Sequence, residues 1–357
     1  MANKHMPYDL AQMQSLPLKA KIIMTKQRIR QWYEHWDGQV YVSFSGGKDS
    51  TVLKHIVDSM YSDVPALFVN TGLEYPEIQS FVRDVKKGKY DCFNSDVEIV
   101  RPEMRFDEVI KKYGYPVVSK EVAQTVSEAK RNASTGKYSY RLKKLNGEAV
   151  DKNGNPSTYN IPQWKFLLDA PYDISHKCCD VMKKKPSKIY EKQTNRKVLL
   201  GTLASESTLR KTQWVRFGCN AFEKGRPTSQ PLSFWTEQDI LHYIKEFIVP
   251  VCPVYGDIVV KPTKDEAEGQ VTVFDVLGDY EQTDLTTTGC DRTGCIFCMF
   301  GCHLEKEPNR FQRLKKTHPK QYEYCINGGE MVDGKWQPNK EGLGLGKVLD
   351  YIGVKYE

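Results

Sequence analysis

The segment 45–50, with the sequence Ser-Gly-Gly-Lys-Asp-Ser, combines residue types that bind phosphate groups. Glycines let backbone N–H groups approach an anion, and a helix beginning near Asp49 would add its positive end. Lys48 can contact phosphate oxygens directly, Ser45 and Ser50 can donate hydroxyl hydrogen bonds, and Asp49 can orient the loop or help hold Mg²⁺. The spacing is not that of a Walker A loop. We therefore predict a phosphate-binding loop in which Lys48, Asp49 and Ser50 are catalytic, rather than an incidental glycine turn.

Clustered cysteines form the second chemical pattern. The chain has ten cysteines. Six of them are grouped in two places: Cys178, Cys179, Cys290, Cys295, Cys298 and Cys302. A Cys-x-x-Cys turn places two sulfurs on one metal ion or one cluster edge, and further thiols can close the site. In a reducing compartment such clustering indicates metal or redox chemistry rather than a disulfide framework.

The loop belongs to a longer string, S-x-S-G-G-K-D-S, which resembles the PP-loop of the adenine-nucleotide alpha hydrolases. That superfamily includes ATP pyrophosphatases, thiolases and sulfonucleotide reductases. Four further strings narrow the resemblance to its phosphoadenosine phosphosulfate (PAPS) reductase-like branch: residues 69–77 (VNTGLEYPE), 178–186 (CCDVMKKKP), 201–210 (GTLASESTLR) and 231–240 (PLSFWTEQDI). They follow the order of that branch and span about residues 40–245. Asn70 replaces its usual acid, and Leu203 stands where it has an arginine.

The resemblance implies an α/β fold with a doubly wound parallel sheet, a basic insertion and a cysteine-rich C-terminal region. It also implies that an adenine nucleotide, either ATP or a sulfonucleotide, is bound with Mg²⁺. The positions that match the nucleotide-binding strings are Ser45, Gly46, Gly47, Lys48, Asp49, Ser50, Asn70, Thr71, Gly72, Glu74, Gly201, Glu206, Ser207 and Arg210.

The same resemblance implies a metal cluster, with several ligand sets open. In adenylylsulfate (APS) reductases the equivalents of Cys178 and Cys179 join those of Cys295 and Cys298 around a [4Fe–4S] cluster. In DNA-phosphorothioation ATP pyrophosphatases, an Arg-x-Gly-Cys-x-x-Cys string matches residues 292–298, so the four later thiols could suffice. A mixed set with Cys290 is the third arrangement, and structural zinc is the alternative metal. The candidate ligands are thus Cys178, Cys179, Cys290, Cys295 and Cys298, and Lys183 would tune the cluster electrostatically.

Three functions follow from this resemblance. The first is an ATP pyrophosphatase in sulfur transfer, which adenylates an acceptor such as a nucleic acid and receives sulfur from a cysteine desulfurase or a thioredoxin-type donor. The second is an APS or PAPS reductase with a displaced nucleophile, because the chain ends YIGVKYE without the E-C-G-[IL]-H tail of those enzymes. Cys302 or Cys325 would then replace the missing thiolate. The third is a nucleotide-sensing regulator without turnover.

Alternating strands and helices must position these residues. Helical spacing over residues 8–38 predicts one or two helices. Strands are predicted over 39–44, 64–70, 97–100 and 198–203, with helices over about 76–88 and 181–194. Such alternation indicates βαβ units and a parallel sheet covered on both faces. We expect a helical segment at 1–38, a nucleotide-binding domain at 39–249 with an insertion at about 127–168, and a cysteine-rich metal region at 250–357.

Composition and charge narrow the class of protein. The 357 residues are 39% hydrophobic and 27% charged, which excludes a disordered chain, and no apolar stretch could span a bilayer. Without a secretory signal, the expected compartment is the cytoplasm. Of the net charge of +7, +6 lies between residues 130 and 165, together with Tyr138, Tyr140 and Tyr159. We expect a hairpin or loop there, and an anionic partner such as a nucleic acid.

Overall fold

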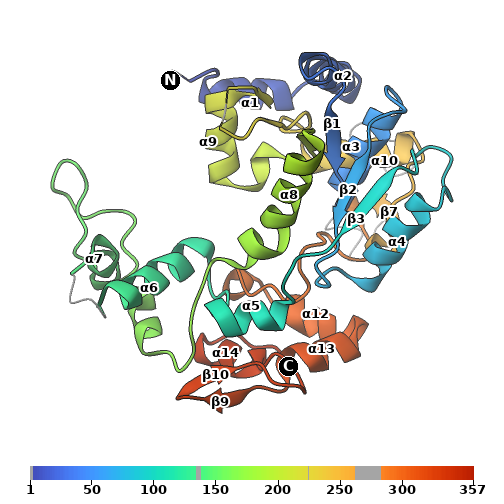
Figure 1. The fold of residues 1–357 in the computed structure, drawn as a ribbon. Helices are drawn as coiled ribbons and strands as arrows, with labels where there is room; N and C mark the ends of the chain where they lie inside the picture. Colours follow the sequence, from blue (N-terminus) through green and yellow to red (C-terminus); the bar gives the residue numbers. More distant parts are fainter. Residues whose placement is uncertain (1–2, 134–137, 224, 262–282) are drawn as a thin grey trace, which may run out of the picture. The chain divides into compact units, whose positions relative to one another are not determined.

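The computed structural model describes residues 3–133, 138–223, 225–261 and 283–357, and its contacts divide the chain into two units (Figure 1). Unit 1 comprises Met1–Asn70, Glu74–Val100 and Ser187–Thr293. Unit 2 comprises Thr71–Leu73, Arg101–Pro186 and Gly294–Glu357. The units are interleaved along the sequence, and the three consecutive domains expected from the sequence stay a prediction.

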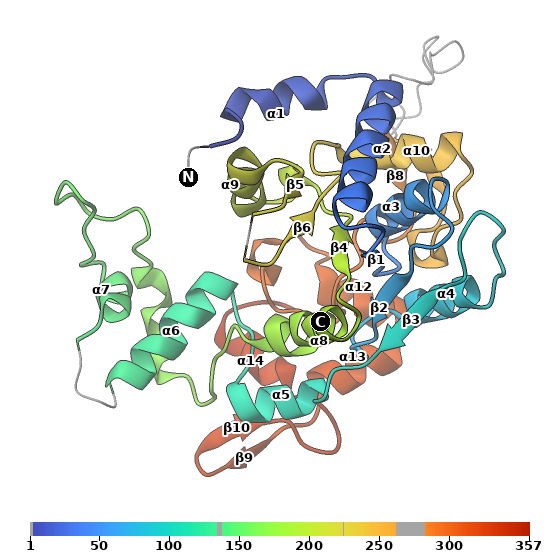
Figure 2. The ribbon, with the colours of Figure 1, turned by 45° about the horizontal axis from the view of Figure 1, so that its top comes forward.

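Unit 1 contains a mostly parallel six-stranded sheet, which confirms the predicted fold class (Figure 2). Its strands, in spatial order, are β3 (Val97–Val100), β2 (Ala66–Val69), β1 (Val40–Ser43), β4 (Lys197–Leu200), β6 (Thr228–Ser229) and β5 (Asn220–Ala221). All neighbours pair in parallel except β5, which runs antiparallel to β6. The four strands predicted from the sequence correspond to β1 to β4.

The order of the strands creates a switch point at β1. This strand pairs with β2 on one side and with β4 on the other, so that Ser43 has Leu67 and Leu200 as its two neighbours in register. The chain therefore leaves β1 in one direction across the sheet and returns on the opposite side. In open α/β sheets the crevice beyond the carboxyl ends of strands at such a point is where ligands bind.

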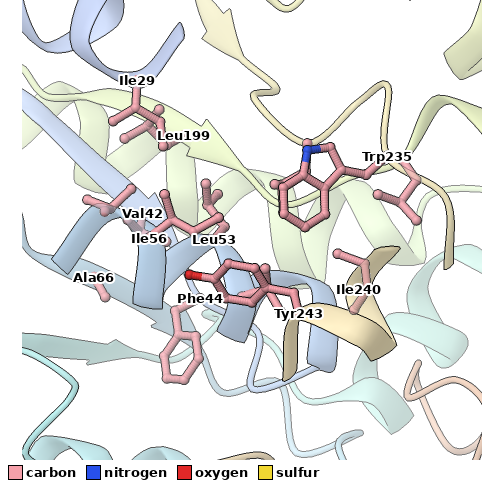
Figure 3. Packing of buried hydrophobic residues seen from close by; sticks show 14 of the residues in the cluster. Ile29, Val42, Phe44, Leu53, Ile56, Ala66, Leu199, Trp235, Ile240 and Tyr243 are labelled. Atoms are coloured by element: carbon pink, nitrogen blue, oxygen red, sulfur yellow. The ribbon is translucent and has the colours of Figure 1, made fainter. Parts of the chain in front are cut away.

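Helices cover both faces of this sheet. Val42 and Phe44 point into one core, where they are packed with α2 (Leu18–His35), α3 (Lys48–Asp58) and α10 (Glu237–Glu246) (Figure 3). Tyr41, which precedes Val42 in the strand, faces the other side, where its ring lies 4.9 Å from that of Tyr190 on α8 (Lys185–Thr194). Alternation of side chains along β1 thus fixes the sheet between two helical layers. The remaining helices and strands of unit 1 are α1 (Pro7–Gln14), α4 (Pro76–Lys86), α9 (Thr208–Phe217), β7 (Ile258–Val260) and β8 (Leu285–Thr287).

Unit 2 is largely helical. Its described elements are α5 (Phe106–Tyr113), α6 (Lys120–Ala133), α7 (Tyr140–Asn146), the 3₁₀ helix η1 (Pro162–Asp169), the π-helix η2 (Asp180–Lys184), the 3₁₀ helix η6 (Cys302–Leu304), α12 (Arg310–Thr317), α13 (Pro319–Ile326), the hairpin β9 (Glu330–Val332) and β10 (Lys335–Gln337), and α14 (Leu345–Tyr351). Within the described ranges, no helix combines the length and apolarity that crossing a bilayer requires.

The basic insertion is helical at its start, where the sequence led us to expect a hairpin or loop. Ser139 caps α7 by accepting a hydrogen bond from the Leu142 N–H, and Gly147 ends it in the left-handed conformation. The only hairpin-like pairing in the described part of the insertion is a bridge between Val150 and Pro156. Gly147 therefore ends a helix, and Gly154 closes a short turn in which its N–H donates to the carbonyl oxygen of Asp151 at 3.2 Å.

Candidate functional site

The predicted phosphate loop joins β1 to α3 at the switch point of the sheet. Gly46 has a φ of +72°, and a Cβ at this position would lie 2.9 Å from Cγ2 of Ile78. Gly201, which follows β4, approaches so closely that its Cβ would lie 2.8 Å from the carbonyl oxygen of Asp49. Both glycines are therefore required by local geometry, and the 201–210 segment lies directly against the loop.

The two serines of the loop bind each other. Their hydroxyl oxygens are 2.9 Å apart, and Ser50 also accepts from the N–H of Ser45 at 3.1 Å. The Ser50 hydroxyl lies 2.9 Å from the carbonyl oxygen of Gly47, to which it can donate. These hydrogen bonds hold the loop in its turn at the start of α3.

Lys48 is buried at the first position of α3, and three residues outside the predicted site contact it. Its Nζ donates to the carbonyl oxygen of Asp291 at 2.6 Å and lies 3.0 Å from the carboxylate of Glu237. Its backbone N–H donates to the hydroxyl of Tyr255 at 3.0 Å. Sequence reasoning missed these three residues, because they lie about 190 to 240 positions along the chain and only Glu237 falls within a recognised string.

Burial raises the pKa of the Asp49 carboxyl above its ordinary value. The charge of Lys48 opposes this effect, Glu237 adds to it, and Arg292 and Arg210 oppose it more weakly. Asp49 therefore lies among both positively and negatively charged side chains at the start of α3. This arrangement is typical of a site that binds a charged ligand.

The 201–210 string supplies a charged pair and a helix cap. Glu206 forms ion pairs with both Arg210 and Arg292. Ser207 caps α9 and accepts from the N–H of Arg210 at 3.3 Å. Leu203, in the place of the family's arginine, is buried in the hydrophobic core. The structure thus places Gly201 against the phosphate loop and Arg210 near enough to act on Asp49. Nucleotide binding by Gly201, Glu206, Ser207 and Arg210 stays a prediction.

The 69–77 string is divided between the two units. Asn70 ends β2 in unit 1, where its N–H donates to the carbonyl oxygen of Val100 at 2.8 Å, and Glu74 also belongs to unit 1. Thr71 and Gly72 belong to unit 2. Nucleotide contacts of these four residues stay predictions.

Four of the five candidate metal ligands belong to unit 2. Cys178 and Cys179 come directly before η2, and their sulfur atoms are 3.9 Å apart. The pKa of the Cys178 thiol is raised by its hydrogen bond to Cys179 and by burial, and the charges of Cys298 and Cys295 add to this. The structure therefore brings the thiols of the tandem pair and of the Cys-x-x-Cys turn into one electrostatic neighbourhood. Cys290 lies in unit 1, where its charge helps to raise the pKa of Cys252.

Positive groups surround this neighbourhood. The hydrogen bond with Cys178 lowers the pKa of the Cys179 thiol to about 5, and Lys120 and Lys183 act in the same direction. Arg310 donates to the carbonyl oxygen of Cys298 at 2.9 Å. Within the ranges that the structure describes, no group of three or more His, Cys, Asp or Glu side chains has the geometry to hold a single metal ion. All ten cysteines lie in those ranges, and none forms a disulfide.

Cys302 and Cys325, the two cysteines expected to act as the nucleophile of a reductase, are enclosed. Cys302 is 1% exposed, and its thiol lies 3.0 Å from the carbonyl oxygen of Met299. Burial raises the pKa of Cys302 to about 11. Cys325 is fully buried, and its pKa is raised for the same reason. Neither has the accessibility or the thiolate character of a reactive cysteine.

Several known proteins are similar to this chain over part of its length. Two curated relatives from Methanocaldococcus jannaschii, the uncharacterized proteins MJ0973 and MJ0066, are 35% identical over 91 residues and 36% identical over 90 residues. These matches cover 25% of this chain in each case, and only 21% and 18% of the relatives. Among solved structures, the chain is similar to phosphoadenylyl-sulfate (PAPS) reductase from Candida auris in its phosphate complex, with a TM-score of 0.36 and 16% identity over 73% of this chain and 90% of that chain.

The family comparison covers most of the chain. The model of the phosphoadenosine phosphosulfate reductase domain matches residues 39–150 and 117–299. This range includes the phosphate loop, the 201–210 string and the first three thiols of the Cys290–Cys302 group. The chain therefore belongs to the phosphoadenosine phosphosulfate reductase domain family, whose members bind adenine nucleotides.

Proposed function

We propose that the protein is an ATP pyrophosphatase that acts in sulfur transfer. The observation that carries this proposal is the arrangement at the switch point, where the glycine loop, Lys48 and the Glu206–Arg210 pair converge in unit 1. Backbone N–H groups and two kinds of cation at a helix start are suited to a polyphosphate. The enclosed Cys302 and Cys325 weigh against the alternative, a reductase with a displaced nucleophile.

In the proposed reaction, an acceptor oxygen attacks the α-phosphorus of ATP. The new bond joins that oxygen to the α-phosphorus, the bond between the α-phosphorus and the bridging oxygen breaks, and pyrophosphate leaves with its electron pair. Lys48 and the loop N–H groups would stabilise the charge that develops on the leaving group. The Asp49 carboxylate is an oxygen donor of the type that Mg²⁺ prefers, and this ion would neutralise phosphate charge.

The four thiols of unit 2 fit an iron–sulfur cluster by their donor chemistry. Cys178, Cys179, Cys295 and Cys298 offer four sulfur ligands, and Lys120 and Lys183 lie near enough to compensate their negative charge. We propose that these four residues hold a [4Fe–4S] cluster. When bound, the cluster would supply sulfur-relay chemistry. A cysteine desulfurase or a thioredoxin-type protein would be the donor in a reducing cytoplasm.

We infer a nucleic acid as the acceptor class from the surface of the insertion in unit 2. Tyr138, Tyr140 and Tyr159 are 55%, 54% and 69% exposed. The structure also reduces the charge available there, because Arg141 pairs with Glu121 and Glu128, and Lys144 pairs with Glu121. Lys137 lies outside the described residues. The support for this acceptor therefore comes from exposed aromatic rings and from the remaining lysines, such as Lys143, rather than from the whole excess of charge.

The deciding experiment is anaerobic incubation with ATP, APS and PAPS separately, with pyrophosphate, AMP and sulfite measured. We expect pyrophosphate from ATP, and Lys48→Ala should reduce its rate by about 10²-fold or more, as is typical when a charge-stabilising donor is removed. Lys87→Ala, an exposed lysine of unit 1, is the matched control and should keep the wild-type rate.

Each alternative has its own signature in that experiment. Sulfite from APS or PAPS in the presence of thioredoxin would establish the reductase. Tight ATP binding without any product, with the expected acceptors present, would support the nucleotide-sensing regulator and contradict the proposed pyrophosphatase.

A further inference from the structure

Glu206 lies between two arginines that come from distant parts of the sequence. Its carboxylate pairs with Arg210, four residues along the chain, and with Arg292, 86 residues away. The side chain of Glu206 is 17% exposed and that of Arg292 is 63% exposed. The pair is therefore anchored on a nearly enclosed acid, and the Arg292 side chain remains accessible to a ligand.

The residues on both sides of Arg292 are attached to the phosphate loop. The carbonyl oxygen of Asp291 accepts from Nζ of Lys48 at 2.6 Å. The hydroxyl of Thr293 lies 2.6 Å from that of Tyr255, which in turn accepts from the Lys48 N–H. A Cβ on Gly47 would lie only 3.0 Å from Oγ1 of Thr293. The segment 291–293 thus packs against the phosphate loop on one side, and Arg292 is the central residue of this segment.

The charges around this segment favour an anion. Lys48 has Glu237 as its carboxylate partner, whereas Arg210 and Arg292 share Glu206. Burial lowers the pKa of Arg210, and the charge of Arg292 lowers it further, as expected for two guanidinium groups that repel each other. Both arginines also act on the pKa of Asp49, which locates them beside the start of α3. Because the two guanidinium groups share the carboxylate of Glu206 in their ion pairs, the exposed Arg292 retains N–H donors that phosphate oxygens can accept.

We propose that Arg292 is a phosphate-binding residue of the nucleotide site and that it contacts the outer phosphates of a nucleoside triphosphate. A guanidinium group can bind phosphate through two parallel N–H donors, and Glu206 holds this group in position before the ligand arrives. In the sequence, Arg292 stood out only as the first residue of the cysteine string Arg-x-Gly-Cys-x-x-Cys. The inference rests on the proposed function for the identity of its ligand.

Equilibrium binding tests this role without turnover. Titration calorimetry would measure the dissociation constants of ATP, inorganic pyrophosphate and AMP for the wild type, Arg292→Ala, Arg292→Lys and the control Arg83→Ala, an exposed arginine of α4. We expect Arg292→Ala to weaken ATP and pyrophosphate about 10-fold or more, because a charge-assisted hydrogen bond is lost. AMP affinity should change by less than about 2-fold, and Arg83→Ala should bind all three ligands like the wild type.

Arg292→Lys should recover part of the lost affinity, since it keeps the charge but not the planar pair of donors. Unchanged ATP and pyrophosphate affinity in Arg292→Ala would overturn the inference, as would an equal loss for ATP, pyrophosphate and AMP. The outcome is separable from that of the proposed function. A wild-type protein that binds ATP through Arg292 but releases no pyrophosphate would contradict the enzyme activity and leave this site in place.

Discussion

Ionisation of the buried Asp49 carboxyl lowers the stability of the folded protein, although the proposed function needs the carboxylate. Its carboxyl is buried at the start of α3, and burial raises its pKa. The folded protein therefore holds this proton more tightly than the unfolded chain does. Above both pKa values the ionised carboxylate costs stability, and this cost disappears as the pH falls through the folded-state pKa toward the ordinary value.

Asp49→Asn should consequently raise the midpoint of thermal unfolding at pH 7, and the gain over the wild type should shrink as the pH is lowered toward 4. The same variant should lose about 10²-fold or more in pyrophosphate release, because the carboxylate that can hold Mg²⁺ is gone. Scanning calorimetry between pH 4 and pH 8, together with the pyrophosphate assay, would check both effects. A variant that is less stable at pH 7 and fully active would contradict this account.

The sequence predicted which residues of the site could bind a ligand better than it predicted which other residues would contact them. The string 45–50 was enough to single out Lys48, since lysine beside paired glycines after a strand has few other uses. Nothing in the sequence indicated that Tyr255 and Asp291 would bind that lysine, because their contacts depend on how distant loops return to β1. Local sequence patterns can therefore identify a hydrogen-bond donor such as Lys48, whereas its hydrogen-bond partners are determined by the tertiary fold.

At the scale of elements, strands and helices followed from local periodicity. The run 39–44 and the helix after it became β1 and α3, since apolar alternation and the 3.6-residue period are both local. The insertion differed, because turn residues were read as hairpin signals although Gly147 ends a helix. The side chains of Arg141 and Lys144 on α7 pair with acids of α6, an interaction between elements that no single segment reveals.

This pairing defines which part of the insertion is free to bind nucleic acid. Tyr140→Ala and Tyr159→Ala should each weaken binding of single-stranded oligonucleotide about 10-fold, as expected for loss of one stacked base. Lys143→Ala should reduce the salt dependence of binding. Fluorescence anisotropy at several salt concentrations would measure both, with Tyr8→Ala, an exposed tyrosine of α1, as the control. Wild-type affinity in both tyrosine variants would remove the nucleic-acid acceptor from the proposal.

At the scale of the whole molecule, the sequence predicted the fold class but not the units. The parallel pairing among β1 to β4 is a direct consequence of strand and helix alternation. The units are interleaved because segments 101–186 and 294–357 contact each other across a long sequence separation. Such long-range contacts leave no periodic signal in the sequence, so these units cannot be predicted from local patterns, and the consecutive domains stay a prediction.

The division into units predicts that nucleotide binding and metal binding are separable. Lys48, Glu206 and Arg210 belong to unit 1, whereas Cys178 and Cys298 belong to unit 2. Cys178→Ser and Cys298→Ser should therefore lose iron and inorganic sulfide while their ATP dissociation constants stay within about 2-fold of the wild type. Lys48→Ala should show the reverse, with full iron content and at least about 10-fold weaker ATP binding.

Anaerobic purification followed by iron, sulfide and zinc assays and by titration calorimetry would measure both properties in each variant. Cys92→Ser is the matched control, since Cys92 is an exposed thiol of unit 1. If the wild-type protein contained one zinc ion per chain and no inorganic sulfide, the cluster proposal would be wrong and the metal would be structural zinc. If every variant, including Lys48→Ala, lost both ATP affinity and iron, the two sites would not be independent. A substitution at one of two independent sites should leave the other site's binding unchanged.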